Sequence, residues 1–147
     1  PQFELIVRDY IERLVNTPSD DYRVIERDMY KILLEILDEK RVLGTVPSLE
    51  EKKGKDYLLA QLQKIATPEA FLAKMKYNPH QHGDVLFLTG VGKVYPFMRS
   101  HKMLDSMQQM FSDIPIVMFY PGEFNGQNLI LFDKFHDGNY YRAFNLL

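Results

Sequence analysis

Apolar residues near the start of the chain recur three or four positions apart. Charged side chains fill the positions between them, so the pattern predicts an amphipathic helix from Phe3 to Asn16. A short strand is predicted near residues 22–27. Asp28 is typical of the residue that caps a helix, and a second helix is predicted from Asp28 to Glu39. A continuous helix from Asp20 to Glu39 is the alternative that the charged residues there leave open.

A polar stretch separates this region from the next helices. Ser48 followed by Glu51 has the capping-box pattern, which predicts a third helix starting at Ser48 and running to Ile65. We interpret the charged run at residues 50–55 as a solvated face of that helix rather than a protein-docking surface. The pair Thr67-Pro68 then predicts the start of a short helix.

Two uninterrupted apolar runs mark the centre of the fold. The runs cover residues 85–88 and 116–120, and the polar Asp84 bounds the first of them. They predict strands near 84–88 and 115–120 that are covered on both faces. Gly90 and Gly92 end the first run, and Pro96 is predicted in the first turn of a helix whose apolar stripe packs on the sheet. The stripe consists of Phe97, Leu104, Met107 and Phe111. Strand, helix and strand therefore predict a βαβ unit with parallel strands.

The end of the chain predicts a hairpin. A third apolar run at Leu129–Phe132 predicts a strand, and Asp137-Gly138 predicts a turn into a further strand over Tyr140–Leu146. The chain has no internal repeat and no low-complexity linker. We therefore expect one α/β domain over residues 1–147, a mixed sheet with helices on both faces. Its βαβ core has strands near 22–27, 84–88 and 115–120, and a C-terminal β-hairpin follows.

The amino-acid composition excludes several classes of protein. The chain of 147 residues has 18 basic and 20 acidic side chains and a net charge of −2, so direct nucleic-acid binding is not expected. The absence of cysteine excludes disulfides and thiolate metal sites. No apolar stretch is long enough to span a membrane, and we expect a cytoplasmic protein. Because the chain begins with Pro1 rather than methionine, we expect that an N-terminal segment is missing.

A glycine-containing turn invites comparison with phosphate-binding loops. Gly90-Val91-Gly92-Lys93 follows a predicted strand and precedes a predicted helix. A Walker loop, however, needs a glycine where this chain has Phe87, and a serine or threonine where it has Val94. The third glycine of a dinucleotide fingerprint would fall at Tyr95. The spacing therefore excludes both motifs.

No catalytic constellation stands out elsewhere. His80 and His82 alternate in a loop, but nothing nearby supplies the third protein ligand that a metal site needs. No serine lies in a nucleophile elbow, and thiol mechanisms need cysteine. We therefore predict a protein that is not an enzyme and that holds no metal and no cofactor.

Several basic residues lie near the N-terminus of a predicted helix, where the helix dipole disfavours positive charge. Arg99, His101 and Lys102 fall in the first turns of the central predicted helix, where the dipole favours anions. Three compensations are open: an anion at the Gly90–Gly92 turn, an acidic patch on a partner, or an internal carboxylate, for which Glu123 is the nearest choice. We also expect at least one of the two glycines to have a positive φ or a close approach to another segment.

Three segments of the chain form sequence motifs that, taken in their order, are specific enough to compare with a known family. They are Thr89–His101, Pro115–Gly122 and Asn139–Phe144. Together they closely resemble the BrxB family, components of the BREX systems with which bacteria defend themselves against bacteriophage. The resemblance runs from about Phe3 to the C-terminus. Members of the family look longer at the N-terminus, where they have an additional apolar strand.

The resemblance implies a place in a multi-protein assembly with a PglZ-type phosphatase-like protein, a BrxC-type ATPase and a DNA methyltransferase. It implies no catalytic activity and favours a non-catalytic adaptor that links larger subunits. The alternative is a module that recognises a nucleotide or nucleic-acid phosphate at the Gly90–Gly92 turn. Tyrosine, phenylalanine and arginine in the last segment suit a binding patch, although a structural role is equally open. The binding or structural motif residues are Gly90, Gly92, Lys93, Pro96, Arg99, His101, Tyr120, Pro121, Gly122, Glu123, Tyr140, Tyr141, Arg142 and Phe144.

Overall fold

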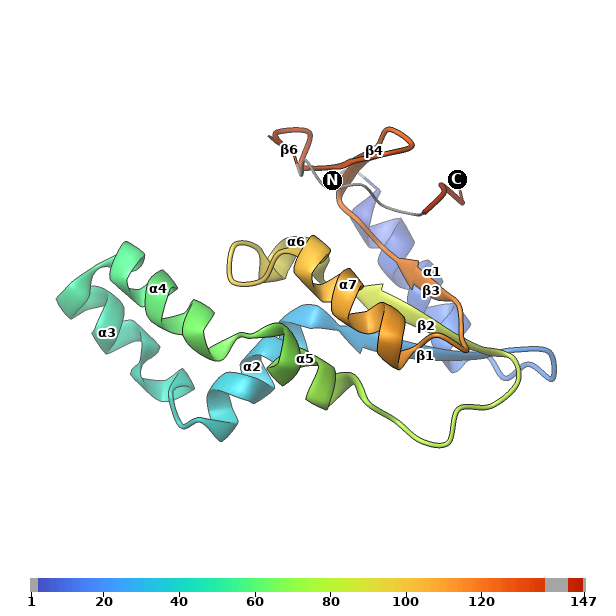
Figure 1. Ribbon diagram of the computed structural model, residues 1–147, viewed down its shortest axis with the longest axis horizontal. Coiled ribbons are helices and arrows are strands. Elements are labelled where there is room, and N and C mark those ends of the chain that lie inside the picture. Colours follow the sequence, from blue (N-terminus) through green and yellow to red (C-terminus); the bar gives the residue numbers. More distant parts are fainter. Residues whose placement is uncertain (1–2, 137–142, 147) are drawn as a thin grey trace. The chain divides into compact units, whose positions relative to one another are not determined.

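The computed structural model (Figure 1) describes residues 3–136 and 143–146, and of these the side chains of Ser100 and His101 are left aside. The chain forms two compact units. The sheet unit comprises residues 1–27, 77–89 and 111–147, and the helical unit comprises residues 28–76 and 90–110. Each unit is described by itself.

A three-stranded sheet with the order β1-β2-β3 lies in the sheet unit. Its strands are β1 (Arg23–Asp28), β2 (Asp84–Thr89) and β3 (Ile116–Met118). β2 and β3 are parallel, with Leu86 opposite Ile116. Leu86, Phe87 and Leu88 are all buried, so β2 is covered on both faces, as its uninterrupted apolar run predicts. The three predicted strands are confirmed, and the alternative of one helix over residues 20–39 is wrong because β1 is extended.

The sheet unit also holds a helix and a second sheet. These elements are α1 (Glu4–Asn16), β4 (Gly122–Phe124), β5 (Leu129–Leu131) and β6 (Phe135–His136). β5 pairs antiparallel with both β4 and β6. The predicted strand at Leu129–Phe132 is confirmed as β5, but it turns back at once, because Phe132 and Asp133 have positive φ values of 53° and 57°. The predicted turn at Asp137-Gly138 lies outside the described residues, and residues 143–146 are not a strand, contrary to the prediction.

The helical unit is built around α2. Its elements are α2 (Met29–Glu39), the 3-10 turn η1 (Leu43–Thr45), α3 (Val46–Lys53), α4 (Lys55–Ile65), α5 (Pro68–Met75), α6 (Val91–Val94) and α7 (Ser100–Met110). α2 packs against α5 and α6, and α5 packs against α7. The predicted cap is confirmed, because the Asp28 carboxylate accepts hydrogen bonds from the backbone N–H groups of Tyr30 and Lys31. Buried apolar residues on these helices include Leu33, Phe71, Met75 and Met107.

Local contacts explain why the third predicted helix differs from the structure, which has α3 and α4 in its place. The capping box at Ser48 is wrong, because the helix already begins at Val46 with Pro47 in its first turn. The Ser48 hydroxyl instead donates a hydrogen bond back to the Thr45 carbonyl at 3.0 Å. Gly54, with a φ of 82°, then separates α3 from α4, so one predicted helix is two.

The central predicted helix also starts later than its sequence suggests. Pro96 lies in the connection between α6 and α7, where its carbonyl accepts a hydrogen bond from the Gln63 side chain at 2.9 Å. The prediction that Pro96 opens the helix is therefore wrong. In α7, Met103 and Met107 are buried, whereas Leu104 is only partly buried. α7 belongs to the helical unit, so the packing of its stripe on the sheet stays a prediction.

Candidate functional site

The glycine turn after β2 is shaped by a carboxylate. Gly90 has a φ of 69°, in the left-handed region, and directly precedes α6. A Cβ atom at Gly90 would overlap Oδ1 of Asp28, the same oxygen that caps α2. Gly92 lies within α6 and has no positive φ. The expectation that one of the two glycines serves backbone geometry is therefore confirmed at Gly90.

This arrangement disfavours an anion at the turn. The Asp28 carboxylate lies against Gly90 and already uses Oδ1 to satisfy two N–H groups of α2. An incoming phosphate would meet a like charge there. α6 is a single turn, and Lys93 at its end is exposed. The geometry favours a backbone role of the turn over phosphate recognition.

A buried carboxylate organises the sheet unit. The side chain of Asp84, at the first position of β2, is fully buried. Its Oδ1 accepts a hydrogen bond from Nε of Arg23 at 2.7 Å, and its Oδ2 accepts one from Nη2 of Arg23 at 2.8 Å. Oδ2 also accepts from the Tyr77 hydroxyl at 3.0 Å and from the Gln81 backbone N–H at 2.9 Å. Asp84 therefore ties the loop before β2 to the start of β1.

These contacts set the ionisation of the cluster. The hydrogen bonds from Arg23 hold the pKa of Asp84 well below its usual range, although burial acts in the opposite direction. Burial and the hydrogen bond to Asp84 raise the pKa of Tyr77 to about 12. Asp84 is therefore ionised and Tyr77 neutral at physiological pH, so the cluster holds one carboxylate fixed between matched donors.

Aromatic rings extend this cluster. The guanidinium groups of Arg23 and Arg27 lie 5.9 and 5.6 Å from the centre of the Tyr77 ring, within the range of cation–π attraction. The Tyr77 ring also contacts the His80 ring, with centroids 4.7 Å apart, and His80 stacks on Phe111 at 5.7 Å. The loop after α5 is thus held through its aromatic side chains.

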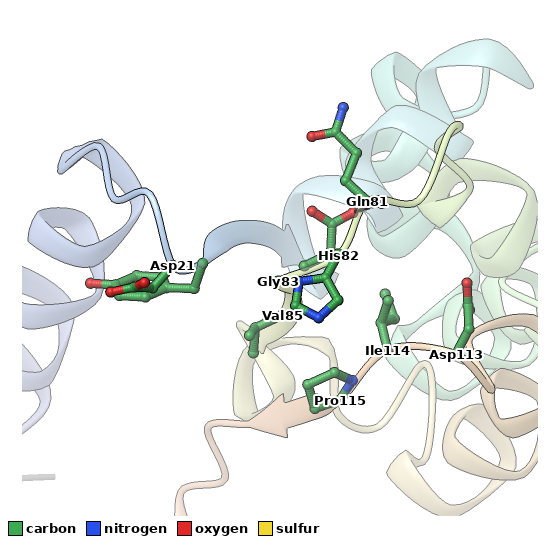
Figure 2. A pocket seen from close by; sticks show the side chains of 10 residues that line it. Asp21, Gln81, His82, Gly83, Val85, Asp113, Ile114 and Pro115 are labelled. Atoms are coloured by element: carbon green, nitrogen blue, oxygen red, sulfur yellow. Dashed lines mark hydrogen bonds between the residues drawn. The ribbon is translucent and has the colours of Figure 1, made fainter.

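A pocket of about 370 Å³ opens beside this cluster (Figure 2). It is lined by Asp21, Tyr22, Gln81, His82, Gly83, Asp84, Val85, Asp113, Ile114 and Pro115. Figure 2 shows Asp21 and Asp113 at opposite sides and the His82 ring between them. Asp84 is held by Arg23, and Asp113 is hydrogen-bonded to Nδ1 of His80 at 2.8 Å, which lowers the pKa of Asp113. Two of the three carboxylates are therefore engaged within the protein.

No three of the described histidine, aspartate and glutamate side chains are grouped so that they would hold a metal ion. Within residues 3–136 and 143–146, no helix is long and apolar enough to cross a membrane.

The motif residues after β3 lie at one edge of the first sheet. The Phe119 N–H donates to the Leu88 carbonyl at 2.9 Å, so Tyr120 and Pro121 follow the same end of the parallel pair as Thr89. Gly122 begins β4, and a Cβ atom there would overlap the Ile130 carbonyl oxygen. Gly122 is therefore required for the pairing of β4 with β5.

The remaining motif residues are divided between the two units. Arg99 is exposed in the helical unit and Glu123 is exposed in the sheet unit, so their pairing stays a prediction. His101 lies in α7, with its side chain outside the description. Tyr140, Tyr141 and Arg142 lie outside the described residues. Phe144 is 81% exposed, in a segment without secondary structure.

Sequence reasoning missed the cluster around Asp84. Asp84 was interpreted only as the polar boundary of an apolar run, and Arg23 and Tyr77 are 61 and 7 residues away from it in the chain. The available signal was a charged residue at the first position of a strand predicted to be covered on both faces. Such a residue needs a partner, but the sequence does not say which one.

Comparisons with known proteins agree with the motifs. The family model described as "BREX protein BrxB" matches residues 25–146. A protein from Bacillus cereus (strain H3081.97) with the same description is 40% identical over 154 residues, covering 100% of this chain and 79% of the relative. A second from Escherichia coli O9:H4 (strain HS), again described as "BREX protein BrxB", is 32% identical over 152 residues, covering 99% of this chain and 74% of the relative. No solved structure matches.

Proposed function

Because this chain belongs to the BrxB family of BREX phage-defence proteins, we propose that it is a non-catalytic adaptor that joins larger subunits of a BREX complex. Such a role needs exposed surfaces suited to protein contacts rather than a reaction centre. We also propose a cytoplasmic location for the chain. Expected partners are the PglZ-type protein and the BrxC-type ATPase.

One observation carries the proposal. Large apolar side chains are exposed at several places in the described chain, and these sites are rich in aromatic residues. They include Phe3, Leu5, Ile6, Tyr10, Tyr57, Phe132, Phe135 and Phe144. Aromatic side chains are enriched at protein interfaces, and exposed apolar groups that gather on one element indicate a binding surface.

The polar cluster supports the same proposal. Asp84 accepts hydrogen bonds from Arg23, Tyr77 and Gln81, so its oxygens are occupied by partners within the chain. A group held in this way stabilises a loop, whereas a general base needs a lone pair directed at substrate. The cluster is therefore suited to holding a rigid surface.

Co-purification tests the adaptor role. The affinity-tagged chain is co-expressed in turn with the PglZ-type protein, the BrxC-type ATPase and the methyltransferase of its own BREX system. We expect at least one subunit to co-elute at a fixed ratio in size-exclusion chromatography with light scattering. Elution of the chain alone in every pairing, and with all subunits present, would overturn the proposal.

The ligand-binding alternative is tested on the same preparation. Equilibrium dialysis with ATP and Mg²⁺ should show no saturable binding, because the turn lacks the Walker spacing and Asp28 lies against Gly90. Saturable binding that is lost in Lys93→Ala would instead support a nucleotide module.

A further inference from the structure

The loop between β4 and β5 contains an asparagine directly before a glycine. Asn125 and Gly126 are both exposed, and Gly126 has a φ of 91° with no neighbour within 4 Å of a built Cβ atom. The backbone nitrogen of Gly126 and Cγ of Asn125 can close a five-membered ring, and a glycine leaves that nitrogen uncrowded because it has no side chain. The loop therefore holds the nucleophile and the electrophile of asparagine deamidation next to each other.

The fold also holds the carboxamide of Asn125 in place. Its Oδ1 accepts hydrogen bonds from the backbone N–H groups of Gln127 at 3.0 Å and Asn128 at 2.7 Å. Both partners are donors, so the oxygen rather than the amide nitrogen faces them. The Asn125 N–H in turn donates to the Asn128 carbonyl at 3.2 Å. The side chain is thus folded back over the backbone that follows it instead of pointing into water.

These two donors contact the atom on which charge develops during deamidation. When the Gly126 nitrogen adds to Cγ of Asn125, the double bond to Oδ1 becomes a single bond and Oδ1 becomes an oxyanion. Two backbone N–H groups at 2.7 and 3.0 Å from such an oxygen have the geometry of an oxyanion hole. Because they are already in position, they stabilise the charged transition state more than the neutral amide.

The nucleophile and the leaving group are also accessible. Within residues 3–136 and 143–146, neither the Gly126 N–H nor Nδ2 of Asn125 takes part in a hydrogen bond. Both residues are exposed, so water can accept the proton of the nucleophile and supply one to the leaving nitrogen. The contacts of the loop therefore hold the oxygen of the carboxamide and leave the reacting nitrogens to solvent.

We propose that Asn125 is a site of spontaneous deamidation that the β4–β5 loop promotes. The Gly126 nitrogen attacks Cγ of Asn125 and gives up its proton, the bond from Cγ to Nδ2 breaks, and Nδ2 leaves with that proton as ammonia. One water molecule then opens the cyclic imide at either carbonyl, which gives aspartate or isoaspartate. Overall, an amide and a water become a carboxylate and an ammonium ion, and nothing is oxidised or reduced.

The two products differ in their effect on the hairpin. Aspartate keeps an oxygen where Oδ1 accepts its two hydrogen bonds. Isoaspartate carries the main chain through the former side chain and lengthens it by one methylene between Phe124 and Leu129, which pair across β4 and β5. The isoaspartate form should therefore exchange the backbone amides of β5 faster than the aspartate form.

Comparison of the folded and the unfolded chain tests the proposal. The full chain is incubated at mildly alkaline pH, either in sodium chloride or in guanidinium chloride at the same ionic strength and at a concentration that unfolds it. Mass spectrometry of the peptides measures deamidation at each asparagine, and electron-transfer fragmentation distinguishes isoaspartate from aspartate. We expect Asn125 to deamidate about three- to tenfold faster in the folded chain, which is the net effect of about one solvated hydrogen bond.

Asn16 is the control within the same chain. It precedes Thr17, whose branched side chain crowds the attacking nitrogen, so its rate should be no faster in the folded chain than in the unfolded one. An equal rate at Asn125 in both samples would show that the Asn-Gly sequence alone sets the rate. A slower rate in the folded chain would show that the loop protects Asn125. Either result overturns the proposal.

A second variant checks which residue reacts. Asn125→Gln keeps a carboxamide but needs a six-membered ring, which closes far more slowly. Circular dichroism verifies that this variant is folded. The acid product should then disappear from the peptide that contains residues 125–128. Persistence of the product at the wild-type rate would assign the reaction to another side chain and count against Asn125.

Discussion

At the scale of single residues, Gly90 carries two constraints that can be separated. Its φ of 69° is unfavourable for any residue with a side chain, and its missing Cβ leaves room for the Asp28 carboxylate. The second constraint links the turn after β2 to the start of α2. A substitution here should therefore affect a helix cap about sixty residues away in the sequence.

Gly90→Ala should lower the free energy of unfolding by about 2–4 kcal/mol. About 1–2 kcal/mol comes from the left-handed backbone, and the rest comes from the overlap with Asp28. Urea denaturation measures the change. Gly126→Ala is the control, because Gly126 also has a positive φ, of 91°, and no neighbour within 4 Å of a built Cβ atom, so its loss reports backbone strain without an overlap. Equal losses in the two variants would show that the contact with Asp28 is unimportant.

The buried carboxylate gives a prediction with a defined pH dependence. The pKa of Asp84 is lower in the folded protein than its ordinary value of 3.8, mainly because of the hydrogen bonds from Arg23. The stability that Asp84 contributes is therefore fully present above the unfolded pKa and is lost as the pH falls through the folded pKa. The wild-type protein should lose this contribution progressively below about pH 4.

Asp84→Asn should lower the free energy of unfolding at pH 7 by about 2–3 kcal/mol. This is less than the 3–5 kcal/mol typical of a fully buried ion pair, because the Arg23 side chain is 43% exposed. Urea denaturation at pH 7, 5 and 3 should show the difference from wild type shrinking at the lowest pH. Asp21→Asn serves as the control, because it removes an exposed carboxylate from the same pocket. A difference that is constant from pH 7 to pH 3 would contradict the ionised pair.

At the scale of elements, the sequence predicted helices and strands correctly where their formation depends on residues close together in the chain. The apolar run of β2 and the Asp28 cap of α2 were predicted because burial on both faces and capping depend on a few neighbouring residues. The start of α3 was mispredicted because the Ser48 hydroxyl has a competing acceptor in the Thr45 carbonyl. The early turn after β5 was missed because Phe132 adopts a positive φ, which is uncommon for a bulky residue.

The candidate site was harder to predict than the fold. The partnership of Asp84 with Arg23 and Tyr77 joins β2, β1 and the loop after α5, and no short-range pattern encodes such a contact. The glycine turn was recognised, but its purpose depends on Asp28, which is distant in sequence. Long-range contacts therefore account for what sequence reasoning left out.

The second sheet depends on a single close approach. Gly122 lies opposite Leu131, and a Cβ atom there would overlap the Ile130 carbonyl oxygen. Gly122→Ala should push β4 away from β5 and lower the free energy of unfolding by about 1–3 kcal/mol. Amide hydrogen exchange at Phe132, whose N–H donates to the Pro121 carbonyl at 2.8 Å, should become faster.

A second glycine of the same hairpin provides the comparison. Gly126, in the loop between β4 and β5, has no neighbour within 4 Å of a built Cβ atom, so Gly126→Ala carries a backbone penalty without an overlap. Exchange at the Phe132 amide should stay close to wild type in that variant. Equal acceleration in both variants would mean that the hairpin is not held by the close approach at Gly122.

At the scale of the whole molecule, charge decides how the chain meets nucleic acid. The 18 basic and 20 acidic residues leave a net charge of −2, so no general attraction draws the chain to a polyanion. If the chain has the adaptor role proposed above, contact with DNA is left to other subunits. Among the motif residues and their neighbours, the exposed cations are Lys93, Arg99 and Lys102 in the helical unit.

Even these three cations are too few for strong DNA binding. If each neutralised one phosphate, the logarithm of the binding constant would fall with the logarithm of salt concentration with a slope of about −2.7, and affinity would drop about 40-fold between 50 and 200 mM salt. We therefore expect no binding of a fluorescent 20-base-pair duplex at 200 mM salt in anisotropy measurements, and only weak binding at 50 mM. Replacing all three cations by alanine should abolish any weak signal. Micromolar affinity at 200 mM salt that survives this triple substitution would contradict the prediction.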